Sequence, residues 1–520
     1  MNDARPRPRD VAQTTLPLPD PPPSEVVSAT LPRHERIYVN RSLRFEQVEL
    51  VGFDMDYTLA IYDQPEIDRL SIEWTVRKLV EERGYPAMLG GLTYRTDFPV
   101  RGLQVDRKLG HVVKMDRYRY VTRGYHGHRE LTKEERRALY HSRRLRGLSG
   151  RFHWVDTLYA LPEVAVYAGA IEALEKAGYE VDADRLFADI RECIDIAHRD
   201  QSIPNAVLAD LPRYVIRDPD LAPTLHKLRS AGKRLFLLTN SAWPYTDRMM
   251  GYLLSGAMPE YPSWRHYFDL VVVSSGKPGF FTEKRPFREI VGDARRPVGS
   301  LERGRIYEGG CIQDLERMLG ARGDGVLYVG DHIYGDVLRA KKETAWRTAL
   351  ILQEMVAEVD ALDRTAEDRR KRHELEQRLA RVDEELRFHV AKLKETERRL
   401  EETKAALRAE KESGSVERSD VANESRVALE ATRRRERRAI DQLRAAATRI
   451  DEEHRALRRH IANQFHPYWG SLFSAGQETS SFGHQIEEYA CLYTARVSNF
   501  LRYSPLHYFR SPRALMPHET

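Results

Sequence analysis

Two aspartates one residue apart, Asp54 and Asp56, directly follow an apolar run at residues 48–53. We expect this run to be a short buried strand. The carboxyl ends of such strands are where open α/β sheets bind ligands. Two carboxylates there are costly to bury without a cation, and hard oxygen ligands suit Mg²⁺. The pair predicts phosphoryl transfer, in which one carboxylate attacks phosphorus and the other acts as general acid and then base. An ordinary Asp-rich turn after a strand is the alternative.

Further apolar runs at 234–238, 268–273, 326–330 and 349–352 alternate with helical patterns. This alternation predicts an α/β fold with a doubly wound parallel sheet. Groups suited to binding phosphate or Mg²⁺ follow three of these runs, namely Thr239 and Ser241, then Lys277, then Asp331 and Asp336. Each group has an ordinary alternative as a helix cap, a solvated lysine or a turn residue. Their order at successive strand ends favours a phosphate and Mg²⁺ site.

The ordered motifs Asp54-x-Asp56, Thr239, Lys277 and Gly330-Asp331…Asp336 resemble those of the haloacid dehalogenase superfamily. The local sequences are similar to the cytosolic purine 5′-nucleotidase (type II, IMP/GMP-preferring) family, as are residues 156–163, 470–473 and 515–519. The resemblance covers about 35–355 and 465–520. It implies a HAD-like Rossmannoid core with a mixed α/β cap. It also implies hydrolysis of IMP or GMP through an aspartyl-phosphate, which is compatible with phosphate transfer to a second nucleoside.

The resemblance assigns the nucleophile to Asp54 and the acid/base to Asp56. It implies Mg²⁺ bound by Asp54, the Asp56 carbonyl and Asp331, with support from Asp336. The other implied sites are a phosphate site of Thr239, Asn240, Ser241 and Lys277, a purine site of Tyr159, Arg191, Asp195 and His198, and an effector site of Tyr334, Lys342 and Gln485. On spacing alone, Arg191 and Asp195 also fit an i, i+4 ion pair on a helix surface. The chain departs from the family pattern at Ala160, Pro204 and Glu488.

Composition shifts along the chain predict five parts. They are a disordered Pro-rich tail over 1–33, a catalytic core over 34–74 and 216–362, a cap over 75–215, a helical arm over 363–462 and a C-terminal helical segment over 463–520 that packs on the core. Because the cap follows the first catalytic strand, we expect it to lie over that strand's carboxyl end and to exclude water from the substrate.

The expected arm carries leucines at seven-residue intervals, namely Leu379, Leu386, Leu393, Leu400 and Leu407. The sequence Ser413-Gly414-Ser415 interrupts them, and a second apolar heptad set follows that is broken at Glu436. The pattern predicts an antiparallel coiled-coil hairpin that self-associates or docks a partner. The arginine-rich residues 433–438 are interleaved with acids, which favours a solvated face over nucleic-acid binding.

The 520 residues contain 84 Lys and Arg against 79 Asp and Glu, so the net charge of +5 does not indicate a nucleic-acid partner. Three widely spaced cysteines and the lack of an apolar leader or spanning segment predict a reduced, cytoplasmic protein. We therefore expect a Mg²⁺-dependent nucleotidase that forms a dimer or tetramer. The alternatives are a phosphatase of another small phosphomonoester and a scaffold protein acting through the arm.

Overall fold

The computed structural model describes residues 31–140, 150–413 and 416–513. Three predicted features lie wholly or mostly outside this range, namely residues 1–30 of the disordered tail predicted over 1–33, the interruption at 414–415 and the motif at 515–519. The chain divides into two compact units, of which one comprises Met1–Val359 with Ser471–Thr520 and the other Asp360–Gly470.

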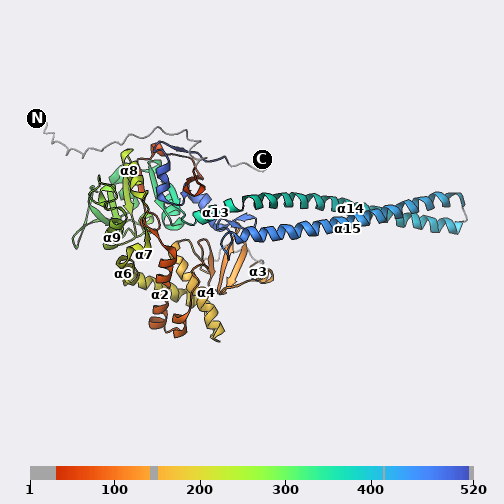
Figure 1. The fold of residues 1–520 in the computed structure, drawn as a ribbon, viewed down its shortest axis with the longest axis horizontal. Helices are drawn as coiled ribbons and strands as arrows, with labels where there is room; N and C mark the ends of the chain where they lie inside the picture. The colour runs from red at the N-terminus through yellow and green to blue at the C-terminus, as the bar shows by residue number, and fades with distance from the viewer. Residues whose placement is uncertain (1–30, 141–149, 414–415, 514–520) are drawn as a thin grey trace. The chain divides into compact units, whose positions relative to one another are not determined.

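A ten-stranded sheet is the centre of the first unit (Figure 1). Its spatial order is β1 (Tyr38–Val39), β20 (Leu492–Thr494), β17 (Arg347–Ile351), β16 (Val326–Gly330), β3 (Leu50–Phe53), β11 (Arg234–Leu238), β12 (Leu270–Val273), β15 (Ile306–Gly309), β13 (Phe287–Val291) and β14 (Ala294–Pro297). The strands from β20 to β15 pair in parallel, and the outer pairs at both edges are antiparallel. The predicted parallel α/β fold is confirmed.

The first predicted strand, β3, lies between β11 and β16, with Phe53 opposite both Leu237 and Val329. All four of its residues are buried. A Cβ on Gly52 would lie 2.1 Å from Cζ of Phe236, so no larger residue fits at this position. Because neighbouring strands are parallel and in register, their carboxyl ends meet at one edge of the sheet.

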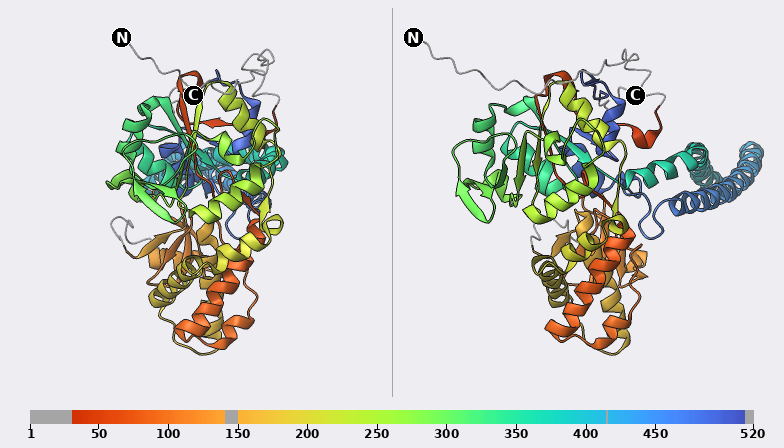
Figure 2. Two further views of the ribbon diagram at one scale, coloured as in Figure 1. Left: turned by 90° about the vertical axis from the view of Figure 1, so that its left-hand side faces the viewer. Right: turned by 60° about the vertical axis from the view of Figure 1, so that its left-hand side comes forward.

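The segment between β3 and β11 forms a second layer with its own sheet, which Figure 2 shows mainly in orange and yellow. This cap segment has an antiparallel sheet in the order β8 (Arg129–Glu130), β7 (Val121–His126), β6 (His111–Met115), β5 (Gln104–Asp106) and β9 (Phe152–Trp154). Its main helices are α2 (Gln64–Arg83), α4 (Leu161–Lys176) and α5 (Ala183–Arg199). Helix α2 thus begins well before residue 75, where the sequence predicted the cap boundary.

Strand β6 ends at Met115, and a turn separates it from β7. The Asp116 carboxylate accepts hydrogen bonds from the backbone N–H groups of Tyr118 and Tyr120, and Arg119 has a φ of 68°. An Asp side chain bound to its own following backbone favours a turn over a continued strand.

Asp68 on α2 is a buried carboxyl, 2% exposed, that accepts a 2.7 Å hydrogen bond from Nε2 of Gln64. Burial raises its pKa to about 8, and Gln64 offsets this only in part. In the unfolded chain this carboxyl ionises near pH 4. Protonated Asp68 therefore contributes its full stability below that pH, and this contribution is lost as the pH rises to about 8. Asp68→Asn, neutral at every pH, should gain up to about 4 kcal/mol relative to wild type between pH 5 and pH 8.

Melting temperatures of both proteins at pH 5, 6.5 and 8 check this expectation, with Glu73→Gln on the exposed side of α2 as the control. A difference between Asp68→Asn and wild type that stays constant over this pH range would contradict it.

The C-terminal segment was predicted to be helical, and the structure corrects this. It contains helix α16 (Ser481–Tyr489) but also strand β20, which pairs with β17 inside the central sheet. A strand of three residues is too short to show a periodicity of its own. The segment therefore extends the core sheet as well as packing on it.

The second unit contains the long helices α14 (Ala366–Ser413) and α15 (Val416–Asn463), which lie side by side (Figure 1). Ion pairs join the start of α14 to the end of α15, such as Lys371 with Glu453 at 3.1 Å. The helices are therefore antiparallel, as the hairpin prediction requires. Whether the arm joins copies of the chain or docks a partner stays a prediction.

Glu436, which breaks the apolar heptads of α15, has a side chain only 1% exposed. It accepts a 2.5 Å hydrogen bond from Nδ1 of His389 and pairs with Nζ of Lys392 at 2.9 Å. A buried polar pair between two helices favours one register over others.

Among the described residues, no helix combines the length and the apolar character needed to cross a membrane.

Candidate active site

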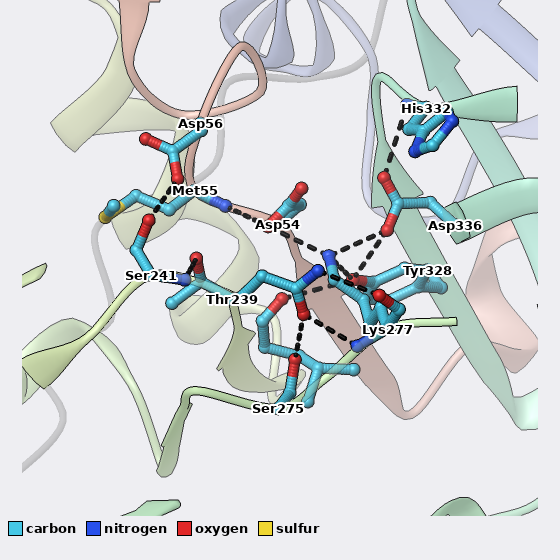
Figure 3. A network of polar contacts seen from close by, with 12 residues as sticks. Asp54, Met55, Asp56, Thr239, Ser241, Ser275, Lys277, Tyr328, His332 and Asp336 are labelled. Atoms are coloured by element: carbon cyan, nitrogen blue, oxygen red, sulfur yellow. Dashed lines mark hydrogen bonds and ion pairs between the residues drawn. The ribbon is translucent and has the colours of Figure 1, made fainter. Parts of the chain in front are cut away.

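Asp54 stands at the carboxyl end of β3, where its backbone N–H donates to the carbonyl oxygen of Val329 at 2.9 Å. Its Oδ1 lies 2.9 Å from Nζ of Lys277 and accepts a 2.8 Å hydrogen bond from the N–H of Met55 (Figure 3). Burial raises the pKa of Asp54 well above its usual value, whereas Lys277 lowers it. The neighbouring carboxylates raise this pKa further, so the site favours a cation beside Asp54.

A tight turn follows Asp54. The carbonyl oxygen of Met55 accepts hydrogen bonds from the N–H groups of Thr58, Leu59 and Ala60, and Tyr57 has a φ of 56°. A non-glycine residue in this left-handed region is strained, and such strain is frequent at functional sites. The turn keeps the side chain of Asp56 at the same end of the strand (Figure 3).

Both carboxylate oxygens of Asp56 accept hydrogen bonds from hydroxyl groups. The Tyr62 hydroxyl donates to Oδ1 at 2.5 Å, and Oγ of Ser241 donates to Oδ2 at 2.6 Å. The hydroxyls of Tyr62 and Tyr245 lie 2.9 Å apart. Burial raises the pKa of Asp56, and the bonds from Ser241 and Tyr62 lower it. A fixed carboxyl group with a raised pKa is suited to acid and base catalysis.

Two carboxylates from the segment after β16, Asp331 and Asp336, gather beside Asp54. One oxygen each of Asp54, Asp331 and Asp336 lies within 4.8 Å of the others. Oδ2 of Asp331 is buried and has no hydrogen-bond partner. Burial raises the pKa of Asp331 to about 7, although Arg101 lowers it. Hard oxygens, one of them without a partner, fit Mg²⁺.

Asp336 was predicted to support the metal, and the structure places it within the carboxylate cluster itself. It lies on a π-helical turn, η7 (Ile333–Leu338), and its Oδ1 accepts a 2.7 Å hydrogen bond from Nζ of Lys277. A Cβ on Gly330 would lie 2.5 Å from its Oδ2, so strand β16 must end in glycine. The predicted contribution of Asp56 through its carbonyl oxygen stays a prediction.

Lys277 connects two of the three clustered carboxylates (Figure 3). Burial alone would lower the pKa of Lys277, but Asp336 and Asp54 raise it well above its usual value. The lysine is therefore charged and lies at the site where phosphoryl oxygens would need a cation.

The loop after β11 contains the other residues predicted to hold phosphate. Oγ1 of Thr239 accepts the N–H of Ser241 at 3.0 Å, and the Ser241 hydroxyl is directed to Asp56. The Asn240 side chain donates to the Lys277 carbonyl oxygen at 2.9 Å and accepts the Lys277 N–H at 2.7 Å. Asn240 thus joins the two loops, and contacts from these residues to phosphate stay a prediction.

Two of the predicted purine-binding residues lie close to the catalytic carboxyls. The Tyr159 ring is edge-on to the rings of Tyr57, at 4.7 Å, and of His198, at 5.9 Å. Burial lowers the pKa of His198, whereas Asp195 and Asp56 raise it. Tyr159 remains 37% exposed, so part of this residue is accessible to a ligand.

The other two predicted purine-binding residues, Arg191 and Asp195, are exposed on α5. Nε of Arg191 lies 3.4 Å from Oε2 of Glu163. Burial raises the pKa of Glu163 to about 7, and Arg191 lowers it. The arginine is therefore paired within the cap segment to a residue outside its own helix, and its role toward a base stays a prediction.

The predicted effector residues lie on three elements, namely η7, α12 (Arg339–Glu343) and α16. Tyr334 on η7 is 41% exposed and accepts a hydrogen bond from Arg339. Nζ of Lys342 lies 5.9 Å from the ring of Tyr489, and Oε1 of Gln485 is buried without a hydrogen-bond partner. Effector binding there stays a prediction.

Four residues that support the site were not found from the sequence. The Tyr62 hydroxyl donates to Asp56, and the Tyr245 hydroxyl lies beside that of Tyr62. Arg101 forms an ion pair with Glu354 and donates to the Asp331 carbonyl oxygen. Arg101 lies 230 positions before Asp331 and 253 before Glu354. No local spacing can indicate such contacts.

The sequence matches the 5′ nucleotidase family over residues 37–520. A 5′-nucleotidase domain-containing protein of Dictyostelium discoideum is 32% identical over 332 residues, which are 62% of this chain and 56% of that protein. The 5′-nucleotidase domain-containing protein 2 of Homo sapiens is 32% identical over 356 residues, which are 65% of this chain and 66% of that protein. The chain thus spans less than two thirds of each relative. Because the family match extends over most of its length, this protein belongs to the 5′ nucleotidase family.

Proposed function

We propose that this protein is a Mg²⁺-dependent 5′-nucleotidase that hydrolyses purine nucleoside 5′-monophosphates of the IMP and GMP type through an aspartyl-phosphate. The observation that carries the proposal is the grouping of Asp54, Asp331 and Asp336 around Lys277, with Asp56 held beside them by hydroxyl groups. Hydrolysis of a phosphate monoester needs a cation that neutralises the phosphoryl oxygens, a nucleophile and a proton donor.

In the first half-reaction, a carboxylate oxygen of Asp54 attacks phosphorus and the bond from phosphorus to O5′ breaks. Asp56, whose pKa is raised by burial, gives its proton to the leaving O5′. Lys277 stabilises the phosphoryl oxygens throughout. Asp54, the Asp56 carbonyl oxygen and Asp331, supported by Asp336, would hold Mg²⁺, which would neutralise phosphate charge.

In the second half-reaction, Asp56 takes a proton from water, and the water oxygen attacks phosphorus. The bond between phosphorus and the Asp54 oxygen breaks, which releases phosphate and restores both aspartates. A nucleoside hydroxyl in place of water would give phosphate transfer by the same steps.

The purine preference is supported by the partly exposed ring of Tyr159 beside His198, close to Asp56. An aromatic ring at this place can stack on a base. Ala160 and Pro204, where the chain departs from the resembled family, lie in this cap segment.

Phosphate release from IMP, GMP, AMP, CMP, UMP and sugar phosphates, with Mg²⁺ and with EDTA, tests the proposal. We expect the largest kcat/KM for IMP or GMP and no release in EDTA. Faster release from sugar phosphates would overturn the nucleotide assignment but keep the phosphatase chemistry. No release from any compound would overturn the enzymatic function.

A further inference from the structure

Arg101 lies in the cap segment, just before β5, but its guanidinium group reaches the catalytic edge of the core sheet. The side chain is fully buried, at 0% exposed. Its Nη1 donates a 2.8 Å hydrogen bond to the backbone carbonyl oxygen of Asp331. A residue of the cap segment therefore contacts the main chain of a carboxylate in the cluster.

Two further contacts fix the guanidinium group. Nε and Nη2 of Arg101 each donate at 2.5 Å to one carboxylate oxygen of Glu354, which follows β17. The group also lies 5.6 Å from the ring centroid of Phe482. A bidentate pair sets the plane of the fork, so the third hydrogen bond to Asp331 has a defined direction.

The next residue, Gly102, permits this close approach. Its φ is 86°, and a Cβ there would lie 2.4 Å from Cβ of Phe482. Any other residue would therefore push the Arg101 turn away from the core. Local backbone and side-chain contacts together hold the guanidinium in one place.

The carboxylate of Asp331 is left available by this arrangement. Its Oδ2 lies 3.9 Å from Nη1 of Arg101 and has no hydrogen bond. The arginine thus binds the main chain of Asp331, and Glu354 compensates its charge. A fixed backbone with a buried carboxylate oxygen that accepts no hydrogen bond is the arrangement expected of a prepared metal ligand.

We propose that Arg101 is a positioning residue that holds Asp331 for Mg²⁺ binding, so that the metal site depends on the cap segment. This inference rests on the metal of the proposed function. Lysine at position 101 keeps the charge but cannot make the three contacts of the fork. Loss of the Glu354 charge leaves Arg101 uncompensated near Asp331, where it competes with the cation. Both changes weaken Mg²⁺ binding.

Calorimetric titration of Mg²⁺ into the full chain without substrate tests the inference. Arg101→Lys should raise the Mg²⁺ Kd about 10- to 100-fold, the usual effect of losing a group that orients a metal ligand. Glu354→Gln should change Kd in the same direction. For phosphate release, Arg101→Lys should raise the Mg²⁺ concentration for half-maximal rate, while kcat at saturating Mg²⁺ returns toward wild type.

The matched control is Arg151→Lys. Arg151 is also in the cap segment and makes a bidentate pair, at 2.7 and 2.6 Å, with the buried carboxylate of Asp106. Its replacement removes a similar pair with no contact to Asp331, so the Mg²⁺ Kd should stay that of wild type.

If Arg101→Lys and Arg151→Lys both bind Mg²⁺ with the Kd of wild type, the inference is overturned and the proposed function stays intact. If Arg101→Lys does not fold, Glu354→Gln decides by the same comparison. If wild type itself gives no Mg²⁺ binding, both this inference and the metal of the proposed function are overturned.

Discussion

Replacing Asp54 with Asn is expected to lower phosphate release from IMP or GMP by at least about 10⁴-fold, the scale on which removal of a catalytic nucleophile acts. Asparagine keeps the size of the side chain and the acceptor for the Met55 N–H, but its amide oxygen is a poor nucleophile. The raised pKa of Asp54 indicates that its charge is costly in the metal-free protein. The variant should therefore fold at least as stably as wild type without Mg²⁺.

Initial rates and melting temperatures, measured side by side, separate lost chemistry from lost folding. Asp324→Asn is the matched control, because Asp324 is 67% exposed and precedes β16 at the opposite end of that strand. If the folded Asp54→Asn protein retains about a tenth or more of the wild-type rate, the nucleophile assignment is contradicted.

Replacing Lys277 with Met should have the largest effect on stability, and it should also reduce catalysis. Nζ of Lys277 lies 2.9 Å from Asp54 and 2.7 Å from Asp336, so its loss leaves two buried carboxylates without their shared cation. Removing one partner of a buried ion pair costs about 3–5 kcal/mol. Loss of its charge beside the phosphoryl oxygens should lower kcat by about 10²- to 10³-fold.

Denaturant unfolding with and without Mg²⁺ measures the first effect. We expect Mg²⁺ to restore part of the lost stability, since it would neutralise the same carboxylates. Lys233→Met is the control, because Lys233 is also buried but donates to the carbonyl oxygens of Phe45 and Val48. That variant should lose stability and keep its kcat. Equal loss of kcat in both variants would show that Lys277 acts only through folding.

The parallel sheet and the order of groups at its edge could be predicted because each strand and the polar residue after it are adjacent in sequence. Asp54, Lys277 and Asp331 follow apolar runs that are buried strands in the structure. Parallel strands must then bring these strand ends to one edge. The prediction needed only local patterns and one rule of sheet topology.

Contacts between elements that are distant in sequence could not be predicted. Glu436 interrupts a heptad in the sequence, yet in the structure it meets His389 from the other long helix. Arg191 has a helical neighbour of opposite charge at Asp195, but its ion pair is with Glu163 on α4. Pairing across elements is decided by packing, which local spacing does not contain.

The central claim is that Asp54 becomes phosphorylated during turnover. We would mix the protein with IMP and Mg²⁺, quench with acid within a single turnover, and locate phosphoryl groups on peptides by mass spectrometry. The account predicts a phosphoryl group on Asp54, more of it in Asp56→Asn, where attack by water lacks its base, and none in Asp54→Asn. Steady phosphate release with no phosphoryl group on Asp54 in any quench, or with the group on another residue, would contradict the account.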